Sequence, residues 1–236
     1  MIFIGNSVQF DGSNDYLTRG AALSSVSDSK QLTASFWYAT GTTSTQRVVW
    51  GGDATPEVLL GFGTTIGFIM RNAADAVICN IGSVIAPQIN IWHHVLISVD
   101  LANSSNRHFY VDGAETLAVT TYTNDTVNFD GPTEWLIGAN NTFAQKINGD
   151  LGELWVAPGV YIDFSSLANR EKFARAGGPV NLGSDGSLPT GTAPAIYLSG
   201  ATSTWHTNLG TGGGFTENGA LADGFLPMPM RKVHVR

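Results

Sequence analysis

Two acidic residues, Asp150 and Glu153, are of the type that glycoside hydrolysis requires. A retaining glycosidase places two carboxyl groups about 5 Å apart, on either side of the bond that is cleaved. Asp150 and Glu153 lie three positions apart in a segment with strand character, so the alternation of side chains along a strand directs them to opposite faces. The spacing therefore argues against glycanase activity, which stays a remote alternative to the non-enzymatic protein that we expect.

The histidines do not have the spacing of a metal site. His93 and His94 are adjacent, and neighbouring side chains on a strand point to opposite faces, so both cannot reach one ion without distortion. The other histidines lie on separate segments and complete no H-x-H or H-E-x-x-H pattern. The single cysteine excludes an internal disulfide, so stability has to come from an apolar core.

Composition and charge narrow the classes of partner. Charged residues make up 13% of the chain and hydrophobic residues 43%, so Thr, Ser, Asn and Gly must cover much of the surface. The net charge is −7, and no basic stripe is longer than Arg231-Lys232, so no nucleic-acid partner is expected. No apolar run is long enough for membrane insertion, and the first residues lack the basic and apolar parts of a signal peptide.

Hydrophobic periodicity predicts an all-β protein. Residues 91–100 alternate with period two, which places Trp92, His94 and Leu96 together on one face of a strand. Asp112-Gly113 between two β-rich runs predicts a hairpin, so three consecutive strands are expected within residues 91–121. Further short strands are expected at residues 32–38, 48–50, 58–62, 66–70, 77–81, 135–138, 151–156 and 195–198.

One helix is expected at residues 164–176, with Ser165 or Ser166 as its N-cap and Gly177-Gly178 as its end. After residue 179, Gly, Ser, Thr and Pro dominate the sequence. Many short strands, frequent turns and one short helix describe a jelly-roll β-sandwich of two antiparallel sheets. We expect a single domain over residues 1–225 and an extended tail over residues 226–236.

Five short segments, in this order along the chain, carry a recognisable pattern of strands and turns. They are residues 8–17 (VQFDGSNDYL), 32–38 (LTASFWY), 92–99 (WHHVLISV), 109–113 (FYVDG) and 149–155 (GDLGELW). The pattern resembles the laminin-G-like and pentraxin-like domains of the concanavalin A-like lectin/glucanase superfamily. The first segment is similar to the opening strand pair of that family, and the last is similar to the strand before its short helix. The resemblance covers residues 8–156 and implies a lectin-like jelly roll.

The resemblance also implies a possible calcium site, because proteins of this family often bind Ca²⁺ at a loop edge through oxygen ligands. The candidate ligands here are Asp53, Asn140, Asn141 and Gln145. Residues 139–145 have no carboxylate where pentraxins supply acidic ligands, so asparagines that form a turn are the alternative interpretation. We therefore expect no cofactor, with calcium as the alternative.

Aromatic side chains give the candidate carbohydrate-binding residues. Trp50, Trp135 and Trp205 lie close to predicted loops, where an exposed indole can stack on a sugar ring. Tryptophan in a β-sandwich more often belongs to the core, which is the alternative for these three. The tryptophans assigned to the core outright are Trp37, Trp92 and Trp155.

Residues 183–191 and 208–216 resemble the C-terminal parts of laminin-G-like proteins encoded by tailed bacteriophages. With the weakly charged surface and the absent signal peptide, this resemblance implies a virion structural protein, displayed on the head as a decoration or on the tail. The expected partners are other virion proteins, further copies of the chain and host-surface glycans. The alternative is a free extracellular carbohydrate-binding module or adhesin.

The expected C-terminal tail combines apolar and basic side chains, and its prolines forbid a helix. As an extended strand it would pair with a sheet edge of a neighbouring subunit. The residues assigned to this assembly contact are Phe225, Met228, Met230, Arg231, Lys232 and Arg236.

Overall fold

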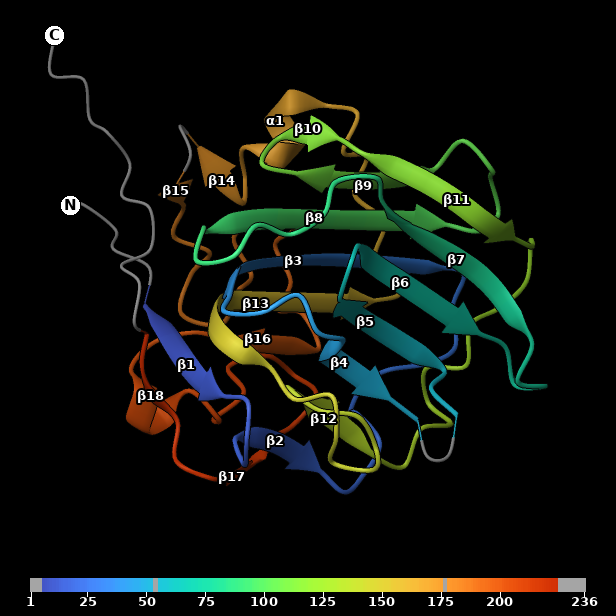
Figure 1. Cartoon of the computed structure of the whole chain (residues 1–236). Helices are drawn as coiled ribbons and strands as arrows, with labels where there is room; N and C mark the ends of the chain where they lie inside the picture. Colours follow the sequence, from blue (N-terminus) through green and yellow to red (C-terminus); the bar gives the residue numbers. More distant parts are fainter. Residues whose placement is uncertain (1–5, 53–54, 176–177, 225–236) are drawn as a thin grey trace, which may run out of the picture.

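The computed structural model describes residues 6–52, 55–175 and 178–224 and shows two antiparallel sheets that face each other (Figure 1). In spatial order, the first sheet contains β10 (Ala114–Glu115), β9 (Arg107–Val111), β8 (His93–Asp100), β3 (Gln31–Thr40), β13 (Asn148–Pro158), β1 (Ser7–Asp11) and β18 (Ala222–Asp223), and β16 (Ile196–Leu198) also pairs with β13. The second contains β11 (Leu117–Tyr122), β7 (Val77–Ser83), β6 (Ile66–Arg71), β5 (Val58–Phe62), β4 (Gln46–Gly51), β12 (Trp135–Ile137), β2 (Tyr16–Arg19) and β17 (Thr216–Asn218). The all-β sandwich predicted from the sequence is confirmed.

The main core lies between the two sheets. In β6 the residues alternate between buried and partly exposed, and the buried members Ile66, Phe68 and Met70 belong to this core. The C-terminal segment contributes as well, because the buried ring of Trp205 meets Phe10 of β1 edge-on at 6.0 Å between centroids. The segment that follows β16 therefore completes the core that the first half of the chain begins.

The outer face of the first sheet is covered too. Trp155 of β13 contacts Phe173 edge-on at 5.2 Å, and Phe173 contacts Phe164 at 5.7 Å, so residues on both sides of α1 (Leu167–Arg170) cover the sheet. The helix is shorter than the predicted 164–176, because Phe164 and Phe173 pack together beside the sheet and the chain then forms a ribbon of β14 (Ala174–Arg175) and β15 (Gly178–Pro179). None of the helical segments within the described residues has the length and hydropathy of a membrane crossing.

The predicted hairpin at Asp112-Gly113 is confirmed. Both residues have positive φ, 51° and 80°, which a two-residue turn of this kind requires, and Ala114 pairs with Val111. The three strands predicted within residues 91–121 were expected to pair in one sheet. This prediction is wrong beyond Glu115, because β11 pairs with β7 in the second sheet. Thr116 makes the crossing: its N–H donates to Phe109 in the first sheet, and its carbonyl accepts from Val84, beside β7.

A β-bulge at Glu153 interrupts β13. The register between β13 and β3 shifts between Gly152 and Trp155, and Glu153 has a φ of 49°. Its buried carboxylate accepts hydrogen bonds from the Tyr197 hydroxyl at 2.8 Å and the Ser199 hydroxyl at 2.7 Å. Burial raises the pKa of Glu153 to about 7. The expectation that Asp150 and Glu153 lie on opposite faces assumed strict alternation along the strand, and the bulge interrupts this alternation. Both side chains are buried.

The raised pKa of Glu153 makes the stability depend on pH. In the unfolded chain the carboxyl group titrates near 4.5, so between pH 4.5 and about 7 the folded state binds more protons. The contribution is fully present below pH 4.5 and is lost as the pH rises through 7, a change of up to about 3 kcal/mol. Glu153→Gln should remove this decline, as measured by urea unfolding across the range. Glu171→Gln, at a half-exposed glutamate, is the control, and an unchanged pH profile in Glu153→Gln would contradict the assignment.

Two strand glycines of the second sheet differ in what a side chain would meet. A Cβ on Gly51 would lie 2.6 Å from the Trp135 ring, whereas a Cβ on Gly67 would meet nothing within 4 Å. Gly51→Ala should lower the free energy of unfolding by about 1–3 kcal/mol, because the overpacked ring cannot move freely. Gly67→Ala should leave it unchanged or raise it by up to about 1 kcal/mol. Thermal unfolding of the two variants tests this, and equal effects would contradict the packing of Trp135 over Gly51.

Candidate functional site

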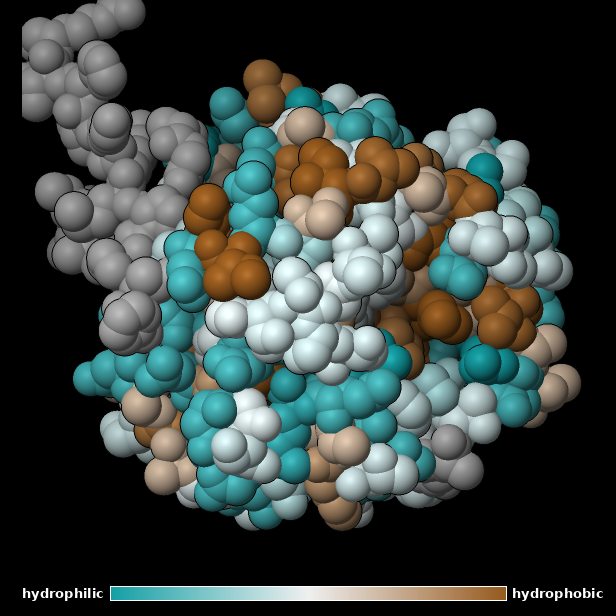
Figure 2. All heavy atoms as spheres, in the orientation of Figure 1, coloured by the Kyte–Doolittle hydropathy of each residue, from teal (hydrophilic) through white to brown (hydrophobic). Residues whose placement is uncertain are grey.

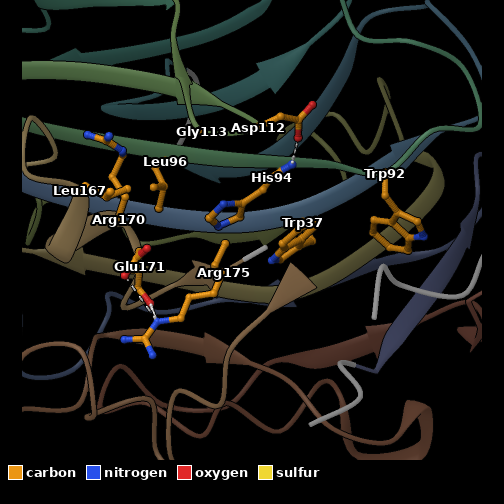
Figure 3. A pocket seen from close by; sticks show the side chains of 11 residues that line it. Trp37, Trp92, His94, Leu96, Asp112, Gly113, Leu167, Arg170, Glu171 and Arg175 are labelled. Atoms are coloured by element: carbon orange, nitrogen blue, oxygen red, sulfur yellow. Dashed lines mark hydrogen bonds and ion pairs between the residues drawn. The ribbon is translucent and has the colours of Figure 1, made fainter. Parts of the chain in front are cut away.

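Hollows that could hold a ligand lie on the outer faces of both sheets. The second sheet carries a groove over β5 and β6, with a volume of about 260 Å³. The first sheet carries a deeper pocket of about 390 Å³ between β3, β8 and the α1 region (Figure 3). Because the sheets face each other, the groove and the pocket open on opposite sides of the sandwich.

Gly61 and Gly67 lie in the floor of the groove, and the row of glycines continues beyond its lining to Gly82. Gly61 of β5 lies opposite Gly67 of β6, and Gly67 lies opposite Gly82 of β7. The three residues share the outer face of the sheet, so three adjacent strands lack a side chain at the same level. Figure 2 is turned toward this face, and the surface is hollowed over β5 and β6.

The next row of the same face forms an apolar wall that ends in an amide. Leu59 lies opposite Ile69, and Ile69 lies opposite Asn80, each two residues from one of the three glycines. A ligand in the groove would therefore meet aliphatic carbon along one side and an amide at one end. The hydroxyl groups at the mouth of the groove belong to Thr45, Thr64 and Thr65.

Arg47 gives the groove its only charged lining group among the described residues. Its guanidinium lies along Gly61, so a Cβ on Gly61 would come within 3.1 Å of Arg47 Nη1. Its Nε is buried with no hydrogen-bond partner among the described residues, and burial lowers the pKa of the guanidinium. No Asp or Glu lines the groove, so it offers hydrogen-bond donors without the carboxylate pair that glycoside cleavage requires.

The tryptophans predicted to bind sugar are all buried. Trp135 and Trp205 have no exposed surface, and Trp50 is 7% exposed, with its Nε1 donating to the carbonyl of Gly52 at 3.0 Å. The prediction that these indoles are exposed is wrong, because each fills a packed cluster instead. Trp50 lies opposite Leu59, so it supports the wall of the groove from the neighbouring strand.

The predicted calcium ligands Asn140 and Gln145 close a turn. Asn140 Oδ1 accepts hydrogen bonds from the Ala144 N–H at 2.8 Å and the Thr142 hydroxyl at 2.9 Å, and its amide donates to Gln145 Oε1 at 3.3 Å. This arrangement is the one expected of asparagine in a turn. In the described part of the chain, no three His, Cys, Asp or Glu side chains are grouped as metal ligands. Asn141 also has an interaction partner. The calcium site stays a prediction.

Several sequence-predicted residues lie outside the described residues, so the structure does not place them. They are the calcium candidate Asp53 and the assembly residues Phe225, Met228, Met230, Arg231, Lys232 and Arg236.

The pocket on the first sheet uses residues that the sequence assigned to the core. Trp92, His94 and Leu96 line it together, as their common face on the predicted strand implies, and Trp37 joins them because it pairs with His94. Trp92 is partly exposed, so its assignment to the core is wrong, whereas Trp37 and Trp155 are buried as predicted. The alternation within residues 91–100 therefore predicted which side chains of β8 share the face of this pocket. The groove could not be predicted in this way, because its glycines lie on different strands and come together only when the strands pair.

Two solved structures resemble the whole chain. One is a heptameric pentraxin from Limulus polyphemus, with a TM-score of 0.59, 12% identity and coverage of 97% of this chain and 98% of the other. The second is a candidate carbohydrate-binding protein from Bacteroides ovatus, with a TM-score of 0.64 and 15% identity. That match covers 96% of this chain but 62% of the other. At these identities the similarities establish the fold alone.

A part of a third structure, the LG1-3 region of the laminin α2 chain, matches with a TM-score of 0.50 and 12% identity over 70% of this chain and 33% of the other. No curated protein sequence matches closely enough to add to these comparisons. The family described as the concanavalin A-like lectin/glucanases superfamily matches residues 11–160, which run from the end of β1 through the bulged strand β13 and include most strands of both sheets. The chain therefore belongs to the concanavalin A-like lectin/glucanase superfamily.

Proposed function

We propose that this protein is a non-catalytic carbohydrate-binding domain that holds an extended glycan in the groove of its second sheet. The observation that carries the proposal is the glycine floor, in which the paired residues Gly61 and Gly67 leave two neighbouring strands without side chains where they line the groove. A chain of flat rings can lie close to such a floor, whereas side chains at these positions would hold it away.

The walls of the groove fit the two kinds of surface that a sugar presents. The aliphatic side chains of Leu59 and Ile69 suit the C–H face of a pyranose ring, and the amide of Asn80 and the guanidinium of Arg47 suit its hydroxyl groups. The Arg47 Nε is buried with no partner among the described residues, so the guanidinium would have to meet a ligand through its terminal nitrogens, one of which lies beside Gly61. The similarity to the Bacteroides ovatus protein supports the same function.

The carboxylates of the described residues support binding without cleavage. A glycanase needs one carboxyl group with a raised pKa beside the substrate, as the general acid. Glu153 has a raised pKa, but it is buried at the bulge of β13, bonded to two hydroxyl groups and absent from the groove lining. A bound glycan would therefore stay intact.

Closing the groove should abolish glycan binding. Gly67→Leu places a side chain where nothing lies within 4 Å, so the fold should tolerate it while the floor is blocked. On an array of immobilised polysaccharides, we expect the wild-type protein to bind at least one glycan and Gly67→Leu to bind it at least tenfold more weakly.

Gly20→Leu is the matched control for that experiment, since Gly20 also has open space around its Cβ position and does not line the groove. It should bind as the wild type does. The array is read with calcium and with a chelator, which also tests the predicted calcium site. Wild-type protein that binds no glycan in either condition, or Gly67→Leu that binds normally, would contradict the proposal.

We further propose, from the phage-like C-terminal segments and the weakly charged surface, that the domain is displayed on a virus particle. Display would bring many copies of a weak glycan site to one host surface, and avidity would then compensate for low affinity. The pentraxin with the same fold is heptameric, and self-association of this chain would act in the same direction.

Mass spectrometry of purified particles from a producing culture tests the display proposal, with this chain quantified against the major capsid protein. A stoichiometric signal is expected, and the copy number would separate a head decoration from a tail appendage. Particles without the chain would leave the free carbohydrate-binding module or adhesin as its function.

A further inference from the structure

The pocket on the first sheet is separate from the groove and is built from other elements. Its floor comes from β3 and β8, one side from the turn at Asp112-Gly113, and the other side from α1 and β14 (Figure 3). In Figure 3, His94 and Trp37 lie at the centre, and Trp92 lies on the side opposite Leu167. Its volume of about 390 Å³ falls near the lower end of small-molecule sites, which span roughly 300–1,000 Å³.

The floor of the pocket is rigid and uncharged. Trp37 and His94 lie opposite each other on adjacent strands, and their rings stack with centroids 4.7 Å apart. His94 Nε2 bonds to the buried hydroxyl of Ser35 at 3.0 Å, and burial lowers the pKa of the imidazole to about 3. His94 is therefore neutral at physiological pH. Figure 3 shows the indole nitrogen of Trp37 on the edge of the ring turned toward Arg175.

The charged groups that line the pocket all have partners within the protein, and their formal charges sum to zero. The Asp112 carboxylate accepts from His93 Nδ1 at 2.7 Å and from the backbone N–H of His94 at 2.8 Å. Glu171 and Arg175 approach each other at 3.9 Å. The lining thus contains two arginines and two carboxylates and gives no net preference for either sign of charge.

The second arginine is held on the protein itself. Arg170 Nη1 donates to the carbonyl oxygens of Phe164 and Ser165, the latter at 3.0 Å, and its guanidinium lies 4.6 Å from the centroid of the Tyr110 ring. It is therefore placed as a fixed part of the wall and is not available as an isolated cation for an anionic ligand.

From this geometry we propose that the pocket is a second binding site, for a small uncharged polyhydroxylated ligand of one or two sugar rings. The apolar surface of Leu96, Leu167 and Ala174 would contact the C–H face of the ring. The carboxylates and arginines, together with the indole N–H, supply acceptors and donors for its hydroxyl groups. A charged ligand would have to compete with the contact between Glu171 and Arg175 and with the protein partners that Asp112 and Arg170 already have.

The pocket does not have the chemistry of a hydrolase, although Ser35, His94 and Asp112 are of the residue types found in a catalytic triad. Asp112 bonds to the ring of His93 and to the backbone of His94, so it does not orient the His94 imidazole. An imidazole with a pKa near 3 is a weak proton acceptor, far from the pKa that suits a general base at neutral pH, and Ser35 is only 2% exposed. The arrangement is suited to binding alone.

Two sites on opposite faces would make one domain bivalent. The groove would hold an extended chain on the second sheet, while the pocket would hold a chain end or a free sugar on the first sheet. One copy of the protein could then connect two glycan chains without forming an oligomer, and each additional copy would multiply these connections.

Titration calorimetry on the full chain tests the pocket with defined probes. The uncharged probes are D-glucose, D-galactose and N-acetyl-D-glucosamine, and the charged comparators are D-glucuronate and D-glucosamine. Ala174→Arg fills the pocket and disturbs its charge balance, and Trp37→Phe keeps an aromatic ring but removes the N–H. Ala193→Arg is the control, because Ala193 is equally half-buried and does not line the pocket. Gly67→Leu, which closes only the groove, is the second control.

We expect at least one uncharged sugar to bind the wild type, with affinity lowered at least tenfold in Ala174→Arg and severalfold in Trp37→Phe. Binding should be unchanged in Ala193→Arg and Gly67→Leu, with circular dichroism confirming that each variant is folded. No binding of any uncharged probe, tighter binding of a charged comparator, or full binding by Ala174→Arg would overturn the proposal. If Gly67→Leu alone loses the sugar, the ligand occupies the groove, so the pocket proposal fails while the proposed function stands.

Discussion

The burial of the first sheet on both faces is the constraint on which the rest of the structure depends. One face packs into the main core, and the other is covered by residues around α1 and β16. Polar side chains on these strands must therefore bond to one another or to the backbone. Thr33 does so by donating to the carbonyl of Val160 at 2.9 Å, Ser35 pairs with His94, and Glu153 accepts from two hydroxyl groups. The pocket is formed where this cover ends, over Trp37 and His94.

The second sheet differs from the first, because no further layer of the described chain covers much of its outer face. β6 alternates between buried and partly exposed residues along its length, and the strands beside it contribute glycine rather than large side chains at the matching level. An open sheet face of large apolar residues would favour aggregation, whereas glycine leaves backbone exposed and little apolar carbon. The glycines also make the outer face concave at this level. Arg47 can lie along the backbone of Gly61 only because Gly61 has no side chain.

Local sequence patterns predicted most of the strands, and long-range register accounts for what they missed. The strand at residues 58–62 was predicted at its observed bounds, because turn residues flank this apolar run. The glycine row depends on pairings between β5, β6 and β7 and cannot be read from a single strand. The crossing at Thr116 could not be predicted either, since nothing in the residues after Gly113 shows which sheet they will join. The tryptophans near predicted loops proved to be buried, because the C-terminal segment and neighbouring strands fold over them.

Three acidic residues, Asp11, Asp112 and Glu153, use their carboxylates to hold the fold. Asp11 accepts hydrogen bonds from the backbone N–H groups of Ser13 and Asn14, so it shapes the turn after β1. Asp112 fixes the start of β8 through His93 and His94, and Glu153 stabilises the bulge in β13. Each of these carboxylates already has protein donors and would lose them by turning toward a substrate, at a cost of about 1–3 kcal/mol for each donor left unpaired. The groove and the pocket are thus left with amide, guanidinium, indole and partnered charged groups, which fit the recognition of hydroxyl groups that we propose.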